Sequence, residues 1–179
     1  MNDVVKLWDK YGLPEDVRKH CRAVAELAVK IASKIKERGN KVDIEAVKLG
    51  ALLHDIGRAI THDPFQHFIK SAEILRKEGL DEKIVRIAER HFSAGLTAEE
   101  ARKLGLPPKD YMPETLEEKI VSFADNLVFG DRPGSFEDFI KRLEEIKREK
   151  PDMGWFVERS IERAKKIKEE IEKLSGLSF

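Results

Sequence analysis

Apolar residues recur at helical spacing along almost the whole chain, and strand-like alternation is nearly absent. One segment, for example, carries the stripe Val17, Val24, Leu27, Ile31 and Ile35. Positions three or four residues apart share one face of a helix, so a stripe of this kind marks a buried face. The pattern predicts an all-α fold, a compact bundle of about seven or eight helices near residues 14–38, 43–60, 64–78, 81–92, 97–104, 114–129, 135–149 and 151–174.

Helix boundaries are indicated by capping residues. The predicted caps are Asp43, Asp63 before Pro64, and two capping boxes, Thr97 with Glu100 and Thr115 with Glu118. In a capping box, each residue of the pair satisfies a backbone N–H of the other. Each cap therefore predicts a helix start.

Two of the predicted helices differ from the rest. Segment 43–60 is apolar on nearly every side, which is typical of a central buried helix. Segment 151–174 instead has one narrow stripe, formed by Val157, Ile161, Ala164, Ile167, Ile171 and Leu174. That stripe either docks on the core or forms a homodimer contact. We expect one domain over 1–179, with a core at about 15–130 and the helices of 135–174 packed on it.

Length and composition narrow the class of protein. A chain of 179 residues suits one domain with a real core. The charged fraction of 38%, rich in Lys, Glu and Arg, is typical of proteins that work at high temperature. With 34 basic and 34 acidic residues, the net charge of +0 does not indicate nucleic acid or an anionic membrane as a partner.

The single cysteine and the N-terminus exclude further classes. With Cys21 alone, neither an internal disulfide nor a cysteine-rich zinc site can form, and a small buried thiol is expected. The start MNDVVKLWDKYG lacks the features of a secretion signal, and no apolar stretch is long enough to span a bilayer. We therefore expect a cytoplasmic protein.

Five polar residues fall on faces that the periodicity predicts to be buried. They are His20, in phase with the first stripe, His54 and Asp55 inside the most apolar helix, His91 in phase with Ile84, Ile87 and Ala88, and Asp125 within IVSFADNLVF. Burying a polar group without a partner costs a few kcal/mol. Taken singly, each could be satisfied by a backbone group in the core. Taken together, they are explained by one divalent cation, since histidine and aspartate from different helices are typical ligands of iron, manganese and zinc.

The same residues resemble a known superfamily. The order His20, His54-Asp55 within LLHDIGR, His91, and Asp125 within FADN is similar to the HD-domain superfamily of metal-dependent phosphohydrolases. The string HDIG at 54–57 resembles its HDIG-type branch, over roughly residues 15–130. Segment 89–128 is also similar to a group of small stand-alone archaeal HDIG proteins. The resemblance implies an HD-type helical bundle.

The resemblance also implies a set of metal ligands. The minimal motif H…HD…D of the family falls on His20, His54, Asp55 and Asp125. Two-metal branches add histidines, for which His67 and His91 are the candidates; His67 opens HFIKSAEIL, with Ser where glycine is commoner. We expect a divalent metal, two ions rather than one, drawn from Fe, Mn, Co, Ni or Zn, with Asp55 as the bridging ligand. Whether His62, in the loop ITHDPF, contributes is left open.

The chemistry expected from such a site is hydrolysis by metal-activated water. The substrate would be a small phosphomonoester, phosphodiester or phosphoanhydride, a nucleotide or a derivative of one. We expect His54, Asp55 and Arg58 to act in catalysis, with Arg58 gripping phosphate oxygens in bidentate fashion. Weaker phosphate-binding candidates are Lys70, Arg90 and Arg132. Two alternatives stay open: a non-catalytic module that senses metal or nucleotide, and a two-iron oxygenase of HD type.

Overall fold

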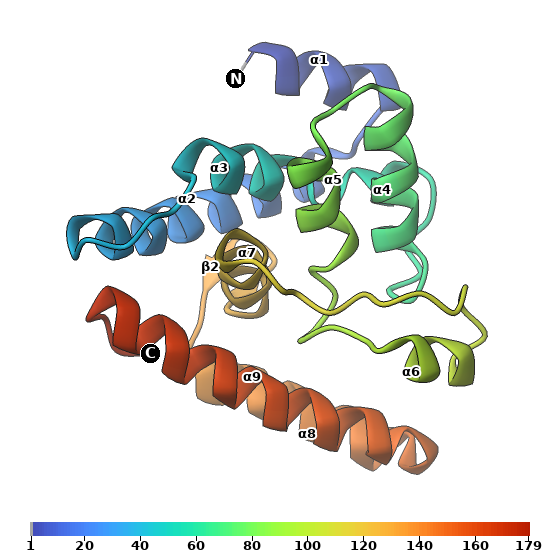
Figure 1. The fold of residues 1–179 in the computed structure, drawn as a ribbon. Helices are drawn as coiled ribbons and strands as arrows, with labels where there is room; N and C mark the ends of the chain where they lie inside the picture. Colours follow the sequence, from blue (N-terminus) through green and yellow to red (C-terminus); the bar gives the residue numbers. More distant parts are fainter. Residues whose placement is uncertain (1) are drawn as a thin grey trace.

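The computed structural model describes residues 2–179, which contain nine α-helices, two short 3₁₀ helices and a two-stranded hairpin (Figure 1). The elements are α1 Asn2–Tyr11, α2 Glu15–Glu37, α3 Ile44–Leu53, η1 Ile56–Ala59, α4 His67–Lys77, α5 Glu82–Glu89, α6 Ala98–Lys103, α7 Leu116–Asn126, β1 Val128–Phe129, β2 Arg132–Pro133, α8 Phe136–Glu149, η2 Pro151–Met153 and α9 Gly154–Ser175. The predicted all-α class is confirmed. Helix α1 and the hairpin were not predicted.

Helix α3 lies at the centre of the bundle and packs against α2, α5 and α7. Its side chains Val47, Ala51 and Leu52 are buried, as a helix that is apolar all round requires. Asp43 caps it by accepting a hydrogen bond from the Ala46 N–H at 3.0 Å. The prediction of a central buried helix that starts after Asp43 is confirmed.

The predicted extent of that helix, 43–60, is wrong. Helix α3 ends at Leu53, and the 3₁₀ helix η1 begins only at Ile56. The cause is a close approach to α4: a Cβ on Gly57 would lie 2.0 Å from the His67 carbonyl oxygen. The Gly57 N–H donates to Ser71 Oγ of α4 at 2.8 Å. Periodicity within a segment cannot detect this contact, because a different helix makes it.

Two other predicted boundaries need correction. Asp63 does not cap a helix that begins at Pro64; its carboxylate accepts from the Phe65 N–H at 2.9 Å, and α4 begins at His67. The predicted helix 114–129 ends at Asn126, because the chain then turns back through the hairpin. Both predicted capping boxes, at the starts of α6 and α7, are confirmed.

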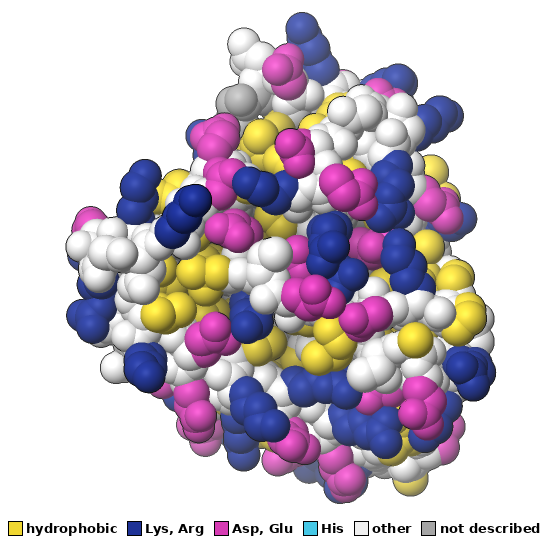
Figure 2. Space-filling model, in the orientation of Figure 1, with side chains coloured by type: hydrophobic (Ala, Val, Ile, Leu, Met, Phe, Trp, Pro, Cys, Tyr) yellow, Lys and Arg dark blue, Asp and Glu magenta, His cyan; other side chains and the backbone are white. Residues whose placement is uncertain are grey.

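Helices α8 and α9 run side by side along one flank of the bundle (Figure 1). The stripe of α9 is buried at Ala164, Ile167 and Ile171, where the helix contacts α2 and α7. On the face drawn in Figure 2, basic and acidic side chains are interspersed. None of the helices in residues 2–179 combines the length and the apolar character needed to cross a membrane.

Candidate metal centre

Six side chains from five parts of the fold meet in the interior. They are His20 of α2, His54 and Asp55 from the turn after α3, His67 from the first turn of α4, His91 just after α5, and Asp125 of α7. All six were singled out from the sequence. The end of α3 at Leu53 explains how adjacent residues His54 and Asp55 both reach the cluster, since on a continuous helix they would point about 100° apart.

One half of the cluster surrounds the second oxygen of Asp55. His20 Nε2 lies 3.4 Å from Asp55 Oδ2 and 2.9 Å from Asp125 Oδ1. His54 Nε2 lies 3.6 Å from Asp55 Oδ2 and 3.3 Å from Asp125 Oδ1. Two imidazole nitrogens therefore share two carboxylate oxygens.

The other half surrounds the first oxygen of Asp55. His67 Nε2 and His91 Nε2 each lie 3.2 Å from Asp55 Oδ1. The same two nitrogens lie 3.2 Å from each other. Asp55 thus presents one oxygen to each pair of histidines.

Backbone carbonyls fix the tautomer of every histidine in the cluster. His20 Nδ1 donates to Gly130 O at 2.6 Å, and His91 Nδ1 donates to Ala88 O at 2.6 Å. His54 and His67 make the same contact with the carbonyls of Ala51 and Asp63, the latter at 3.3 Å. Because a carbonyl only accepts, Nδ1 must carry the proton, and a neutral ring then presents the Nε2 lone pair to the cluster.

This arrangement fits a bound cation. The lone pairs on His67 Nε2 and His91 Nε2 face each other and the Asp55 carboxylate. These groups repel one another unless a positive charge lies among them. Asp55 Oδ1 is buried and makes no hydrogen bond of acceptable geometry with any described residue. Imidazole nitrogens and carboxylate oxygens within reach of one another are also the donor set that divalent transition metals prefer. The residues present therefore fit one or more divalent metal ions.

The electrostatics of the cluster favour ionised carboxylates and a neutral His91. Burial lowers the pKa values of His20 and His54, but the same carboxylates outweigh burial and raise them. Burial raises the pKa of Asp125, but the neighbouring His54 and His20 outweigh burial and hold that pKa well below its usual range. Burial lowers the pKa of His91 and keeps its ring neutral. An ionised carboxylate and a neutral imidazole are the forms that bind metal.

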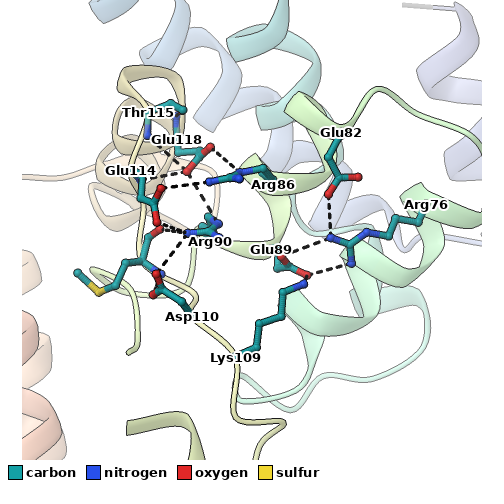
Figure 3. Close-up of polar contacts among 11 residues, drawn as sticks. Arg76, Glu82, Arg86, Glu89, Arg90, Lys109, Asp110, Glu114, Thr115 and Glu118 are labelled. Carbon is teal, nitrogen blue, oxygen red and sulfur yellow. Dashed lines mark hydrogen bonds and ion pairs between the residues drawn. The ribbon is translucent and has the colours of Figure 1, made fainter. Parts of the chain in front are cut away.

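Two buried charges at the end of α5, Glu89 and Arg90, directly precede His91 and take part in a network of ion pairs (Figure 3). Arg90 pairs with Glu114 at 3.3 Å and donates to the Met112 carbonyl. Glu89 accepts from Arg76 Nη1 and Lys109 Nζ, each at 3.0 Å. Burial raises the pKa of Glu89, but these two cations lower it further than burial raises it. The network ties α5 to α4 and to the segment that leads into α7.

A cavity of about 650 Å³ opens beside the cluster and is lined by five of its six residues, His20, Asp55, His67, His91 and Asp125. Arg58 also lines it, with Nε 3.4 Å from Asp55 Oδ2 and the side chain 37% exposed. Arg58 therefore lies beside the centre, and its predicted role in binding phosphate stays a prediction.

The weaker candidates lie elsewhere. His62 is exposed in its loop, and Arg132 is exposed on β2. Lys70 pairs with Glu73 at 3.1 Å, and Arg90 belongs to the network just described. None of these four residues lines the cavity.

Sequence reasoning missed other residues of the cavity. Among them, Lys19 and Asn126 directly precede and follow the predicted ligands His20 and Asp125, which was the available signal. The Asn126 side chain donates to the carbonyl of Ser93, a non-glycine residue with φ +50°. Contributions from α8 and α9 had no signal, because their lining residues form ordinary amphipathic stripes.

The helical bundle and its buried histidine-aspartate cluster define a class, the metal-dependent phosphohydrolases built on an all-helical scaffold. The sequence profile of the HD domain family matches residues 17–130, more than half of the chain. The chain belongs to the HD domain family.

Relatives support this assignment. An uncharacterized protein of Methanocaldococcus jannaschii is 57% identical over 130 residues, covering 73% of this chain and 76% of that protein. A tRNA (cytidine(56)-2'-O)-methyltransferase of Thermoplasma volcanium is 50% identical over 123 residues, which are 69% of this chain but 35% of the methyltransferase. Ribonuclease Y of Acidothermus cellulolyticus is 32% identical over 141 residues, which are 76% of this chain and 24% of that enzyme. The chain thus spans about a third or less of these two longer enzymes.

Solved structures show the same fold. The HD domain of the L. monocytogenes phosphodiesterase PgpH superposes with a TM-score of 0.54 at 21% identity, covering 97% of both chains. A second structure of that domain, in complex with cyclic-di-AMP, gives a TM-score of 0.54 at 19% identity, covering 97% of this chain and 96% of the other.

Proposed function

We propose that this protein hydrolyses a phosphoester or phosphoanhydride bond of a nucleotide or nucleotide-derived substrate, at a centre of two divalent metal ions. His20, His54, Asp55 and Asp125 would hold one ion, and Asp55, His67 and His91 the other. The observation that carries the proposal is the placement of Asp55, whose two oxygens face different pairs of imidazole nitrogens at 3.2 to 3.6 Å.

The protein residues bind and orient. The carbonyl partners of Nδ1 hold each imidazole ring in place, so that the ligands converge before any ion arrives. Divalent ions held by these residues would lower the pKa of a bound water and neutralise charge on a phosphate. Arg58 Nε lies 3.4 Å from Asp55 Oδ2 with the side chain partly exposed, and it would bind a phosphate oxygen of the substrate.

The relatives support a phosphodiester in particular. PgpH is named a phosphodiesterase, ribonuclease Y is named for RNA, whose nucleotides are joined by phosphodiester bonds, and one PgpH structure contains cyclic-di-AMP. The methyltransferase relative is named for a tRNA nucleotide. We therefore place phosphodiesters of nucleotides, including cyclic dinucleotides and short RNA, ahead of simple phosphomonoesters in the search for the substrate.

The test is a substrate screen with defined metal content. Protein loaded anaerobically with manganese, cobalt or nickel is incubated with nucleotides, cyclic dinucleotides and short oligonucleotides, and product is quantified. We expect metal-dependent turnover that a chelator abolishes. Asp55→Ala should lose metal and turnover together, while Asp131→Ala, an exposed aspartate that lines the same cavity, should keep both.

Two results would contradict the proposal. One is full metal content and full turnover in Asp55→Ala. The other is turnover that occurs only with iron and oxygen, which would make the protein an oxygenase of HD type.

A further inference from the structure

The cavity beside the metal centre has a second wall that the metal ligands do not form. Helix α8 contributes Phe139, Leu143 and Ile146, α9 contributes Phe156, and Phe92 follows the ligand His91. The HD profile match ends at residue 130, so the contributions of α8 and α9 lie outside the segment that defines the family. These five residues form the second wall; four of them lie outside the matched segment, and Phe92 lies inside it.

The second wall is apolar, and its aromatic rings are stacked. Phe139, Leu143 and Phe156 are buried except for the surface they present to the cavity. The rings of Phe92 and Phe156 stack with centroids 5.7 Å apart and planes inclined by 19°. Phe92 stacks in turn on Phe68, at 5.2 Å and 14°. Such a surface offers planar groups contact area but few hydrogen bonds.

The rim of the cavity is polar and includes two exposed cations, Lys19 and Arg142, and two exposed carboxylates, Asp16 and Asp131. Lys19 extends from α2 next to the ligand His20, and Arg142 extends from α8 with its guanidinium 5.5 Å from the Phe129 ring. The cavity thus combines an ionic end at the metal centre, charged side chains of both signs at its rim, and an aromatic and aliphatic wall. A molecule with a phosphate at one end and a planar apolar group at the other matches this distribution.

The volume of the cavity also suits a molecule of this kind. At about 650 Å³ the cavity lies within the range of roughly 300–1,000 Å³ that is usual for sites of drug-sized ligands. An inorganic phosphate or a short sugar phosphate would leave most of it filled with water against an apolar wall, which is unfavourable.

We propose that the second wall binds the nucleobase of a nucleotide whose phosphate lies at the metal centre, and that Leu143, Ile146 and Phe156 determine which substrates are accepted. This inference rests on the proposed function for the position of the phosphate. It assigns substrate selection to α8 and α9, and leaves metal binding to the residues between 20 and 125.

The test compares two probes on the manganese-loaded full chain by isothermal titration calorimetry. Inorganic phosphate reports on the metal end alone, and AMP and CMP report on both ends. We expect wild-type protein to bind a nucleoside monophosphate at least about tenfold more tightly than phosphate, since contact of a base with aromatic side chains commonly contributes a factor of that order.

Filling the cavity should remove that preference. Ile146→Trp places an indole at the half-buried edge of the second wall, and we expect it to abolish the preference while phosphate affinity stays unchanged. Glu145→Trp is the matched control, because Glu145 is an exposed neighbour on α8 outside the cavity lining. Ile146→Ala cannot overpack the cavity. It should weaken the binding of AMP and CMP but not of phosphate, and it provides the test if the tryptophan variant fails to fold.

The outcomes separate this inference from the proposed function. Equal affinity of the wild-type protein for phosphate and nucleotides, or equal weakening of both by the Ile146 variants, would overturn the inference even if the protein hydrolyses phosphodiesters. Preserved selectivity without any hydrolysis would overturn the proposed function and leave the inference standing.

Discussion

Glu100 holds α9 against α6, and its removal should weaken that contact by a calculable amount. The carboxylate is 2% exposed and accepts from Arg163 Nη1 and Nη2 at 2.7 Å each and from Arg159 at 2.9 Å. Glu100→Gln removes the charge but keeps a side chain that can complete the capping box with Thr97. The substitution therefore isolates the ion pairs that dock α9, the helix that carries Phe156.

The pKa of Glu100 sets the magnitude. Burial raises this pKa, but the bond from Arg163 and the remaining partners lower it from 4.5 to about 2. One pKa unit corresponds to about 1.4 kcal/mol, so the lowered pKa is equivalent to about 3 kcal/mol of stability. Arg159 is 43% exposed, and solvent screens its share. We expect Glu100→Gln to lower the free energy of unfolding by about 2 kcal/mol at neutral pH.

The sign of the pH dependence follows from the direction of the pKa shift. Because the folded pKa lies below the unfolded one, the stabilisation is fully present above about pH 4.5 and is lost as pH falls toward 2. Urea unfolding followed by circular dichroism at pH 7, 5, 4 and 3 measures it. The difference between wild type and Glu100→Gln should shrink below pH 4.5. Glu99→Gln, at an exposed neighbouring carboxylate, is the control and should show little difference at any pH.

A pH-independent difference would refute this reasoning, because loss of packing or of the cap does not titrate. A difference below about 0.5 kcal/mol at pH 7 would also refute it, since that is the usual range of an exposed ion pair.

Two further substitutions test the turn and the two halves of the metal centre. Gly57→Ala should destabilise the fold by at least about 2 kcal/mol in urea unfolding, because its Cβ would clash with the His67 carbonyl oxygen at 2.0 Å. Gly154→Ala, at a helical glycine with no atom nearer than 3.6 Å, should be neutral or slightly stabilising, and similar losses in both variants would contradict the clash. His67→Ala should cost one of two metal equivalents by elemental analysis, and an unchanged metal count would indicate a mononuclear centre.

Much of the candidate site could be predicted from the sequence because its residues violate helical patterning. His20 and His91 fall in phase with apolar stripes, and Asp125 interrupts an apolar helix, so burial followed from local periodicity. The unfavourable free energy of burying such groups alone then pointed to a shared cation. Residues on the solvent side of a helix carry no such signal, and Lys19 was missed for that reason.

The shape of the site could not be predicted in the same way. The end of α3 at Leu53 depends on contact of Gly57 with α4, and the orientation of His20 depends on the carbonyl of Gly130 at the hairpin tip. Helix α1 was missed because its two buried side chains, Val4 and Trp8, form too short a stripe to stand out. The buried position of Trp8 depends on a tertiary contact, in which its indole N–H donates to Leu52 O at 3.1 Å.

By itself the sequence determined the all-helical class, five of the six clustered polar residues and the capping of three helices, because each depends on residues within one turn or on the period of 3.6. The sixth residue of the cluster, His67, was indicated only by the resemblance to the HD family. Only the tertiary structure decided which oxygen of Asp55 faces which histidines, and that α8 and α9 complete the cavity. Those facts depend on distances between segments far apart in the chain, which packing of the whole bundle sets and local patterning does not encode.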